Sequence, residues 1–273
     1  MRKLKNFVIS FISNIIYFFR KNNIIHFTGT FKNWEEAKKH SKGYNDLKIL
    51  EKVKYSANQV LSGKATYERD GVAFFENNFS YQTLATILRA SIENKNKCKV
   101  IDFGGSLGST YYQNRSFFKH IKNLKWIVVE QNTYVRTGKK YFSDKIIKFY
   151  ESIEEATKYL KKPNVAIVSG TIQYLPNPYI VLNKIIKTNV DYIVIDRNPF
   201  IIKGKTKLTV QKIPKKIVKS SYPIWLFGEN EFRKIFKKKY KEIATFDALD
   251  GVIGYGKLKA CYKGIIYKRK NSN

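Results

Sequence analysis

The sequence has few of the residues that hold metals or disulfides. Its 273 residues include two cysteines, Cys98 and Cys261, and three histidines, His26, His40 and His120. Two cysteines this far apart build no disulfide framework and match no zinc spacing, and the histidines are too scattered to share an ion. We therefore predict a protein without a metal centre, in a reducing, cytoplasmic setting.

Several familiar ligand-binding motifs are also missing. The glycines of segment 104–108 do not follow the G-x-G-x-x-G spacing of dinucleotide-binding folds, and no Gly-Lys-Ser/Thr sequence provides a P-loop. Lysine supplies most of the positive charge, and neither an arginine-rich run nor an aromatic RNA-binding motif accompanies it. These absences argue against an oxidoreductase, a P-loop nucleotidase and a dedicated nucleic-acid-binding module.

The net charge of +31 is the strongest bias of the composition. A basic chain can bind nucleic acid, an anionic membrane or an anionic substrate. A genome whose codons favour Lys, Asn and Ile gives the same surplus without any ligand, and all three residues are abundant here. The charge is spread along the chain, with one dense cluster at 234–241. Charge alone therefore does not identify the partner.

Residues 1–22 form a separate segment with basic ends and an apolar middle. Basic residues precede and follow the apolar stretch Phe7–Phe19. The stretch is too short to cross a bilayer comfortably, and no small-residue cleavage site follows it, so neither a membrane span nor a signal peptide is expected. We predict an amphipathic helix that lies in the interface of an anionic membrane. Packing of the same helix on the protein's own core is the alternative.

Residues 23–95 are predicted to form a helical cap in front of the main domain. Asn33 is a suitable N-cap with Glu36 three residues later, so a helix is expected to follow it. The spacing of apolar residues predicts two more helices, Leu47–Leu61 and Tyr81–Glu93.

Strands and helices alternate over residues 96–270, which predicts a mostly parallel sheet with helices on both faces. Strands are expected at Lys99–Phe103, Lys125–Glu130, Lys145–Tyr150, Asn164–Ser169 and Asp191–Asp196, with a final pair at Thr245–Leu249 and Ala260–Lys268. Helices are expected at Ser116–Lys122, Thr133–Tyr141, Ile153–Lys161, Tyr179–Lys187 and Glu229–Tyr240. Prolines and a glycine predict an insertion or short hairpin at about 198–223, and Asp250–Gly256 reads as a turn. The predicted fold class is α/β, with a Rossmann-like, seven-stranded sheet.

The stretch 99–108 carries the clearest functional signal. A short apolar run ends at Asp102 and opens into a glycine-rich turn, as expected at the carboxyl end of a buried strand. Open α/β sheets bind ligands at this edge, and glycine lets the backbone approach a ligand closely. The next strand ends at Glu130, about twenty residues further on, the usual distance for an acid that holds a ribose diol. Together these features predict a nucleoside-type cofactor.

Four segments stand in the order found in class I S-adenosylmethionine-dependent methyltransferases. They are Val100–Gly108, Trp126–Gln131, Ser169–Pro178 and Asp196–Pro199. The first is similar to that family's Asp-x-Gly-x-Gly-x-Gly motif, with Ser106 in place of the middle glycine. The chain as a whole resembles methyltransferases encoded in bacterial surface-polysaccharide and lipopolysaccharide gene clusters, and the likeness extends to 34–37, 41–44 and 67–70. The resemblance implies the class I methyltransferase fold and S-adenosylmethionine as cofactor.

The resemblance also implies a cofactor site at the carboxyl ends of the first strands. Its residues are Asp102, Gly104, Gly105, Gly108, Glu130, Gln131, Glu151 and Ser169. The glycines line the amino-acid end of the cofactor, and the two oxygens of Glu130 accept hydrogen bonds from both ribose hydroxyls. Glu151 either meets the adenine amino group or caps a helix.

The loop after the fourth strand is expected to face the transferred methyl group. Tyr174 and Gln173 position a substrate hydroxyl there, or Tyr174 simply packs in the core. Asp196 serves as a general base if burial raises its pKa, and Arg197 grips a phosphate or carboxylate, unless the two form a structural ion pair. The remaining predicted substrate contacts are Tyr111, Tyr112 and Arg69. The alternatives are that the two tyrosines serve helix packing and that the charged turn with Arg69 is simply solvated.

We therefore predict an S-adenosylmethionine-dependent methyltransferase that O-methylates a sugar or an anionic glycan precursor, free or lipid-linked, at the inner face of the cytoplasmic membrane. Methyl transfer requires alignment of the nucleophile and exclusion of water, so a weak base suffices for a sugar hydroxyl. An RNA methyltransferase of the same fold is an alternative, which the lack of an RNA-binding module disfavours. A non-catalytic binding protein on the same fold is another, with which Ser106 is compatible.

Overall fold

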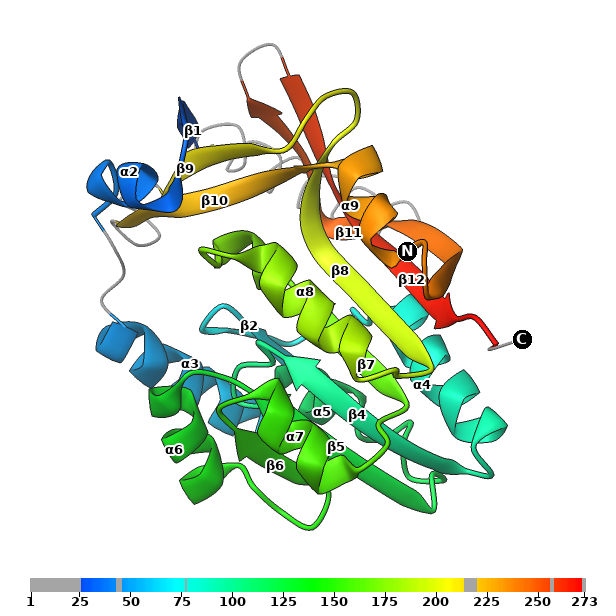
Figure 1. Cartoon of the computed structure of the whole chain (residues 1–273). Helices are drawn as coiled ribbons and strands as arrows, with labels where there is room; N and C mark the ends of the chain where they lie inside the picture. The colour runs from blue at the N-terminus through cyan, green and yellow to red at the C-terminus, as the bar shows by residue number, and fades with distance from the viewer. Residues whose placement is uncertain (1–25, 43–45, 77, 214–219, 256–257, 272–273) are drawn as a thin grey trace, which may run out of the picture.

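The computed structural model describes residues 26–42, 46–76, 78–213, 220–255 and 258–271. A twisted sheet crosses the molecule, with helices on both of its faces (Figure 1). The helix predicted at 1–22 lies outside the described residues. Within the described ranges, no helix is both long enough and apolar enough to cross a membrane.

Helices and strands alternate regularly through the middle of the chain. The described helices are α2 Trp34–Lys39, α3 Asp46–Leu61, α4 Tyr81–Glu93, α5 Ser109–Asn114, α6 Asn132–Tyr141, α7 Ile153–Leu160, α8 Pro178–Lys187 and α9 Glu229–Phe236, with a 3₁₀ turn at Ile172–Tyr174. The described strands are β1 His26–Phe31, β2 Tyr67–Arg69, β3 Val72–Phe74, β4 Lys97–Phe103, β5 Asn123–Val129, β6 Ile147–Tyr150, β7 Val165–Ser169, β8 Tyr192–Ile201, β9 Lys207–Ile213, β10 Ser220–Gly228, β11 Tyr240–Tyr255 and β12 Leu258–Arg269.

The main sheet has a parallel part with strand order β6-β5-β4-β7-β8. Antiparallel β12 follows β8, and β11 pairs with β12 on its other side. Five parallel strands with a terminal pair are the arrangement that the methyltransferase resemblance implies, so the predicted fold class is confirmed. The chain leaves β4 toward β5 on one side and later returns to β7 on the other, which makes the β4–β7 boundary the topological switch point where such sheets bind ligands.

Side chains of the parallel strands alternate between two packed layers because neighbouring residues of a strand point to opposite faces. Val100 and Val128 share a core with residues of α4, α5 and α6, whereas Ile101 and Ile127 share a core with residues of α7, α8 and α9. Burial on both faces explains why these strands are apolar runs in the sequence, without a polar alternation.

Strand β8 changes partners midway along its length. Up to Asp196 it pairs with β7, which ends at Ser169. Beyond this point Phe200 and Ile201 pair with β10, which pairs with β9, and β9 pairs with β1. Between the two parts Arg197 has a φ of +56°, a left-handed conformation that is uncommon for residues other than glycine. The sheet thus continues past the end of β7 as an upper set of strands (Figure 1).

The N-terminal third is only partly helical. The three predicted helices correspond to α2, α3 and α4, and the Asn33 side chain accepts a hydrogen bond from the Glu36 amide at 2.9 Å, as the capping pattern predicts. Strand β1 and the β2–β3 hairpin were not predicted, and β1 forms one edge of the large sheet. The expected helical cap is therefore a mixed one.

The helix predicted at Ser116–Lys122 is wrong. Phe118 and Ile121 are buried three residues apart, which gives the sequence a helical spacing. Their amides donate to carbonyls three residues back, at 3.2 and 3.0 Å, so the segment forms successive turns. Burial against the sheet, and not a continuous helix, produces the periodicity.

The end of the chain also differs from the prediction. The turn expected at Asp250–Gly256 is wrong, since β11 continues to Tyr255 and pairs with β12. The register shifts between Asp247 and Val252, so the Gly and Asp residues there mark a bulge within a strand. The hairpin expected at about 198–223 is present as β9 and β10, although β8 itself runs on to Ile201.

Replacing Gly138 of α6 with alanine tests how tightly this helix packs on the sheet. A Cβ atom at Gly138 would lie 2.4 Å from the buried Phe149 ring. Alanine favours helices by about 1 kcal/mol over glycine, but overpacking a core costs about 1–3 kcal/mol. We expect G138A to lower the free energy of unfolding in a urea titration, whereas K140A on the exposed side of α6 changes it by less than about 0.5 kcal/mol. A more stable G138A would contradict this packing.

Candidate functional site

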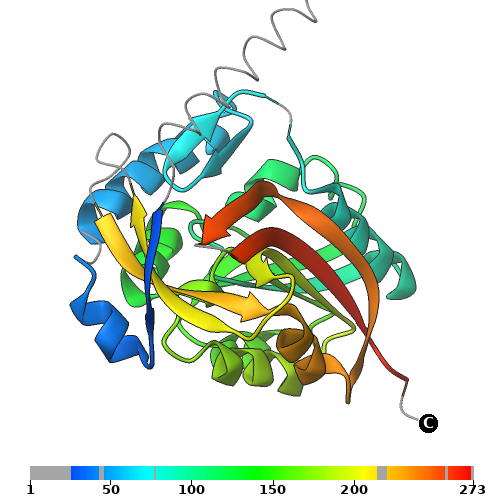
Figure 2. The same ribbon diagram turned by 90° about the horizontal axis from the view of Figure 1, so that it is seen from above.

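The carboxyl ends of the parallel strands border a cavity of about 970 Å³, a volume at the upper end of the range for small-molecule sites. Its walls come from the turn after β4, the ends of β5, β7 and β8, helix α3 and the segment from β2 to α4. Figure 2 looks down on this end of the molecule, with β1, β9 and β10 on one side and β11 and β12 on the other. The cavity therefore lies at the topological switch point between β4 and β7.

The turn after β4 keeps the backbone close to its neighbours. Gly104 has a φ of +71°, and a Cβ atom there would lie 2.2 Å from Oγ1 of Thr171. Ser106 adopts a φ of +55°, a left-handed conformation, where the resembled motif has glycine. The serine therefore retains the turn at the cost of some backbone strain. Gly108, predicted to touch the cofactor, is not among the residues that line the cavity, and a Cβ atom there would lie 2.5 Å from the Ile147 side chain.

Asp102 lies beneath the glycine turn. It is 1 % exposed, and its Oδ2 accepts a hydrogen bond from Nε1 of Trp126 at 3.1 Å. Gly105 makes room for the carboxyl group, because a Cβ atom there would lie 2.5 Å from it. Burial raises the pKa of Asp102 to about 7, while the Trp126 hydrogen bond opposes this and the Glu130 charge adds to it. Asp102 thus supports the turn from below.

Glu130 follows β5 and lines the cavity beside the glycine turn. Its Oε1 accepts the Ser106 amide at 3.3 Å and its Oε2 accepts the Gln131 amide at 2.9 Å. Burial raises the pKa of Glu130, and these two backbone hydrogen bonds oppose the effect. A carboxylate has about four acceptor positions, so each oxygen keeps capacity for another donor. Glu130 is therefore held in an orientation that suits a vicinal diol.

The other predicted cofactor residues reach the same cavity from adjacent strand ends. Gln131 is exposed beside Glu130, and Glu151 follows β6, where its Oε1 accepts the Asn132 side-chain amide at 2.6 Å. Ser169 ends β7, and its carbonyl accepts the Thr171 hydroxyl at 2.9 Å. The parallel topology brings these residues together although they are far apart in the sequence.

Asp196 ends the part of β8 that pairs with β7, and it lines the cavity. It is 6 % exposed, and its Oδ1 accepts the Arg197 amide at 2.8 Å while its Oδ2 accepts the Ser80 hydroxyl at 3.3 Å. Burial raises the pKa of Asp196 to about 6, against the effects of the Arg197 charge and of these hydrogen bonds. Asp196 is therefore a carboxylate that can take up a proton near neutral pH.

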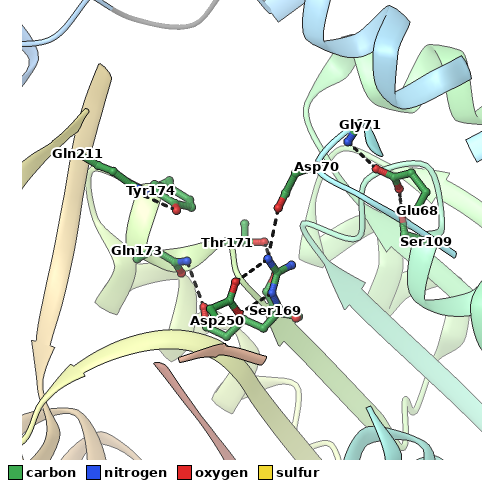
Figure 3. Close-up of polar contacts among 11 residues, drawn as sticks. Glu68, Asp70, Gly71, Ser109, Ser169, Thr171, Gln173, Tyr174, Gln211 and Asp250 are labelled. Carbon is green, nitrogen blue, oxygen red and sulfur yellow. Dashed lines mark hydrogen bonds and ion pairs between the residues drawn. The ribbon is translucent and has the colours of Figure 1, made fainter. Parts of the chain in front are cut away.

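The guanidinium group of Arg197 lies between two aspartates, Asp70 and Asp250, both of which are labelled in Figure 3. Its Nε and Nη2 donate to the Asp250 carboxylate at 2.9 and 3.0 Å, and Nη2 also donates to Asp70 at 3.3 Å. Its contact with Asp196 runs through the backbone amide, so the alternative of an Asp196–Arg197 ion pair is wrong. A bidentate grip on a substrate anion would have to displace Asp250.

Gln173 and Tyr174 share the 3₁₀ turn after β7 but have different surroundings. Gln173 is 1 % exposed, and its Nε2 donates to the Arg197 carbonyl at 3.2 Å. It supports the left-handed residue of β8 and, although predicted to contact substrate, is not among the residues that line the cavity. The Tyr174 ring lines the cavity, and its hydroxyl donates to Oε1 of Gln211 at 3.2 Å (Figure 3).

Tyr111 and Tyr112 were predicted to contact substrate, and the structure places both in the core. The Tyr111 ring lies 5.6 Å from the Trp126 ring, and the Tyr112 hydroxyl donates to the Phe142 carbonyl at 2.6 Å. The face of α5 that lines the cavity consists of Ser109, Thr110, Gln113 and Asn114. These four residues have the spacing of one helix face, so the two tyrosines must point to the other.

The β2–β3 hairpin contributes a buried carboxylate that has no local signal in the sequence. Glu68 is 5 % exposed and accepts hydrogen bonds from the Ser109 hydroxyl and from the Gly71 amide (Figure 3). The Ser109 bond fastens the hairpin to the start of α5, next to the glycine turn, and the Gly71 bond lies within the hairpin itself. Arg69, a predicted substrate contact, lines the cavity and lies over the Tyr67 ring. A charged turn has the same sequence pattern whether it is solvated or folded over a site.

The charge of the cavity is opposite to that of the chain. Its acidic lining residues are Glu68, Asp70, Asp102, Glu130, Glu151, Asp196 and Asp247, and its basic ones are Lys52, Arg69 and Arg197. The chain as a whole has 52 basic and 21 acidic residues. Acidic side chains are thus concentrated at the cavity. In the part of the chain that the structure describes, no three acids, histidines or cysteines gather closely enough to hold a metal ion.

The sequence matches no family model and no curated protein. The N-terminal domain of EvdMO1 with SAH bound is similar in structure at 8 % identity, over 84 % of this chain and 98 % of that one, with a TM-score of 0.45. The glycopeptide N-methyltransferase MtfA complexed with S-adenosyl-L-methionine is similar at 9 % identity, over 68 % and 94 %, with a TM-score of 0.45. CalS10, an amino pentose methyltransferase from Micromonospora echinaspora, is similar at 7 % identity, over 79 % and 96 %, with a TM-score of 0.43. Likeness at this level carries no inference about function, which rests on the residues of the site.

Asp102→Asn is expected to change how stability depends on pH. The native pKa of Asp102, about 7, lies above its unfolded value, so the native state binds more protons between the two and loses stability as pH rises through that range. Asparagine can still accept the Trp126 hydrogen bond and does not titrate. In urea titrations from about pH 5 to about pH 8, the free energy of unfolding of D102N should rise relative to that of the wild type. The rise should be about 1.4 kcal/mol for each unit by which the pKa of Asp102 is shifted. Parallel pH profiles would show that the carboxyl group is not buried as described.

Proposed function

We propose that the protein is an S-adenosylmethionine-dependent methyltransferase that holds its cofactor at the carboxyl ends of β4, β5 and β6. The observation that carries the proposal is the Glu130 carboxylate, which is fixed beside the glycine turn at the switch point with capacity for a ribose diol. The cavity of about 970 Å³ has room for a second small molecule beside the cofactor.

The residues present suit a nucleoside without phosphate groups. The turn from Asp102 to Thr110 has no lysine or arginine, whereas P-loops add a basic side chain to their glycines. Gln131 and Glu151 offer amide and carboxylate groups that can meet a purine base. The acidic lining also favours a cofactor that carries a positive sulfonium centre.

S-adenosylmethionine, when bound, supplies an electrophilic methyl group. The chain's own residues orient the acceptor, exclude water and hold the proton that the acceptor loses. Asp196 is suited to hold this proton because its carboxylate contacts the cavity and its pKa is raised to about 6 by burial. The β2–β3 hairpin and residues 78–83 line the cavity and reduce the access of water.

We further propose that the acceptor is a sugar or a similar polar precursor of a surface glycan. Aromatic Phe79 and Tyr81 line the cavity and suit the apolar face of a sugar ring. Ser80, Gln113 and Tyr174 supply groups that can form hydrogen bonds with its hydroxyls.

Substituting Glu130 tests the cofactor site. Titration calorimetry of the full chain with S-adenosylhomocysteine should give micromolar binding for the wild type. E130A removes both acceptor oxygens and should weaken binding at least about tenfold, because a hydrogen bond to a charged group contributes about 1.5–3 kcal/mol. E130Q keeps one acceptor oxygen and should bind with intermediate affinity.

The matched control is E154Q on α7. Glu154 pairs with Lys184 at 2.9 Å on the protein surface, so its replacement should leave the affinity unchanged. Equal affinity of all four proteins, or no binding by the wild type, would contradict the assigned cofactor site. Circular dichroism of each variant verifies that it is folded.

The basic N-terminal segment is proposed to bring the protein to an anionic membrane, where a lipid-linked acceptor would lie. The apolar stretch Phe7–Phe19 with basic residues on both sides has the composition of an interfacial anchor. Deletion of residues 1–21 should reduce cosedimentation with phosphatidylglycerol vesicles by about tenfold or more, because apolar burial and charge attraction are lost together. Equal sedimentation of the two forms would exclude this anchor.

A further inference from the structure

The charge of the cavity bears on which acceptor it takes. The surplus of lysine in the chain leads to the expectation of an anionic substrate, but seven of the described cavity-lining residues are acidic and three are basic. Electrostatic attraction into a site depends on the potential in the cleft itself, where low-dielectric walls strengthen it. The cavity therefore disfavours the entry of a phosphate or carboxylate.

These acids form two groups within the cavity. Asp102, Glu130 and Glu151 follow or end the adjacent strands β4, β5 and β6, which is the half assigned to the cofactor. The other acids come from the β2–β3 hairpin, from β8 and from β11. The second group is not needed to hold a nucleoside. Within it Glu68 is bonded to Ser109 and Gly71, and Asp70 is paired with Arg197, which leaves Asp196 and Asp247 for the acceptor.

The two arginines of the second half are already engaged, whereas Lys52, the third basic residue of the lining, is exposed. Arg197 is held by Asp250 and Asp70 through hydrogen bonds of 2.9–3.3 Å. Arg69 lies over the Tyr67 ring, with its guanidinium carbon 5.4 Å from the ring centre. An anionic acceptor would have to break these contacts to pair with either arginine, whereas a cationic one leaves them in place.

Asp196 is the carboxylate of this half that is best prepared to meet a cation. Its two oxygens each accept one hydrogen bond, from the Arg197 amide and the Ser80 hydroxyl, and the remaining acceptor positions are free for a further donor. It lines the cavity, and burial raises its pKa to about 6, so it can also take up a proton. Asp247, an exposed residue of β11, adds a second negative charge to the same cavity.

We propose that the acceptor carries a basic amine, as in an amino sugar, which enters as an ammonium ion and pairs with Asp196. One N–H proton then passes from the ammonium nitrogen to the Asp196 carboxylate, which leaves a neutral amine with a free electron pair and a protonated acid. This inference rests on the proposed function, and it replaces the hydroxyl and anionic acceptors expected from the sequence with an amine.

Three related sugars test the proposal. Binding of D-glucosamine, D-glucose and D-glucose 6-phosphate to the full chain, with S-adenosylhomocysteine present, can be measured by saturation-transfer NMR. Glucosamine should bind about tenfold more tightly than glucose, and the phosphate more weakly than glucose, because a charge-assisted hydrogen bond in a partly buried site contributes a factor of this size. D196N should remove the preference for the amine.

Two further variants control the result. D247N changes an exposed carboxylate and should reduce the preference about twofold, in line with the small contribution of an exposed ion pair. This variant also keeps the test valid if D196N does not fold, and E154Q should have no effect. Equal or undetectable binding of the three sugars, or tighter binding of the phosphate, would overturn the proposal. Calorimetry with S-adenosylhomocysteine alone distinguishes this failure from a failure of the cofactor site.

Discussion

The site depends on the point at which β8 stops pairing with β7. The pairing ends at Ser169 and Asp196, and the next residue, Arg197, adopts a left-handed conformation. Such a conformation is unfavourable for arginine, so it persists because surrounding contacts determine it. These contacts are the hydrogen bond from Gln173 to its carbonyl and the ion pairs with Asp250 and Asp70. The separation of the two strands leaves Asp196 at the cavity wall.

Much of the fold follows from local patterns. The apolar runs of the five parallel strands, the helical spacing of α3 and α4 and the Asn33 cap can all be recognised in the sequence because burial and capping act over a few residues. Glu130 could be placed for the same reason, since the end of a buried strand after a glycine turn has a fixed location in an α/β sheet. Ser106 shows that the turn requires a left-handed residue, not glycine itself.

The rest of the site could not be predicted because it is assembled from distant segments. Ser80 contacts Asp196 from 116 residues away, and Asp250 contacts Arg197 from 53 residues away. Nothing near these residues in the sequence indicates either contact. Tyr111 and Tyr112 illustrate a different difficulty. The residues that follow the glycine turn point in part to the cavity and in part to the core. Helix α5 has only six residues, so the spacing of its apolar residues is too short to show which side chains face the core.

The position of β12 has a consequence for how the chain is made. This strand, at Leu258–Arg269, lies between β8 and β11, so β8 lacks its neighbour on that side until the residues of β12 have left the ribosome. The open edge includes Ile193, Val194 and Ile195, which are fully buried once the sheet is complete. An apolar strand edge of this kind is a template for pairing with other chains. Synthesis that stops before β12 therefore releases an aggregation-prone chain, even though the glycine turn and Glu130 have already been made.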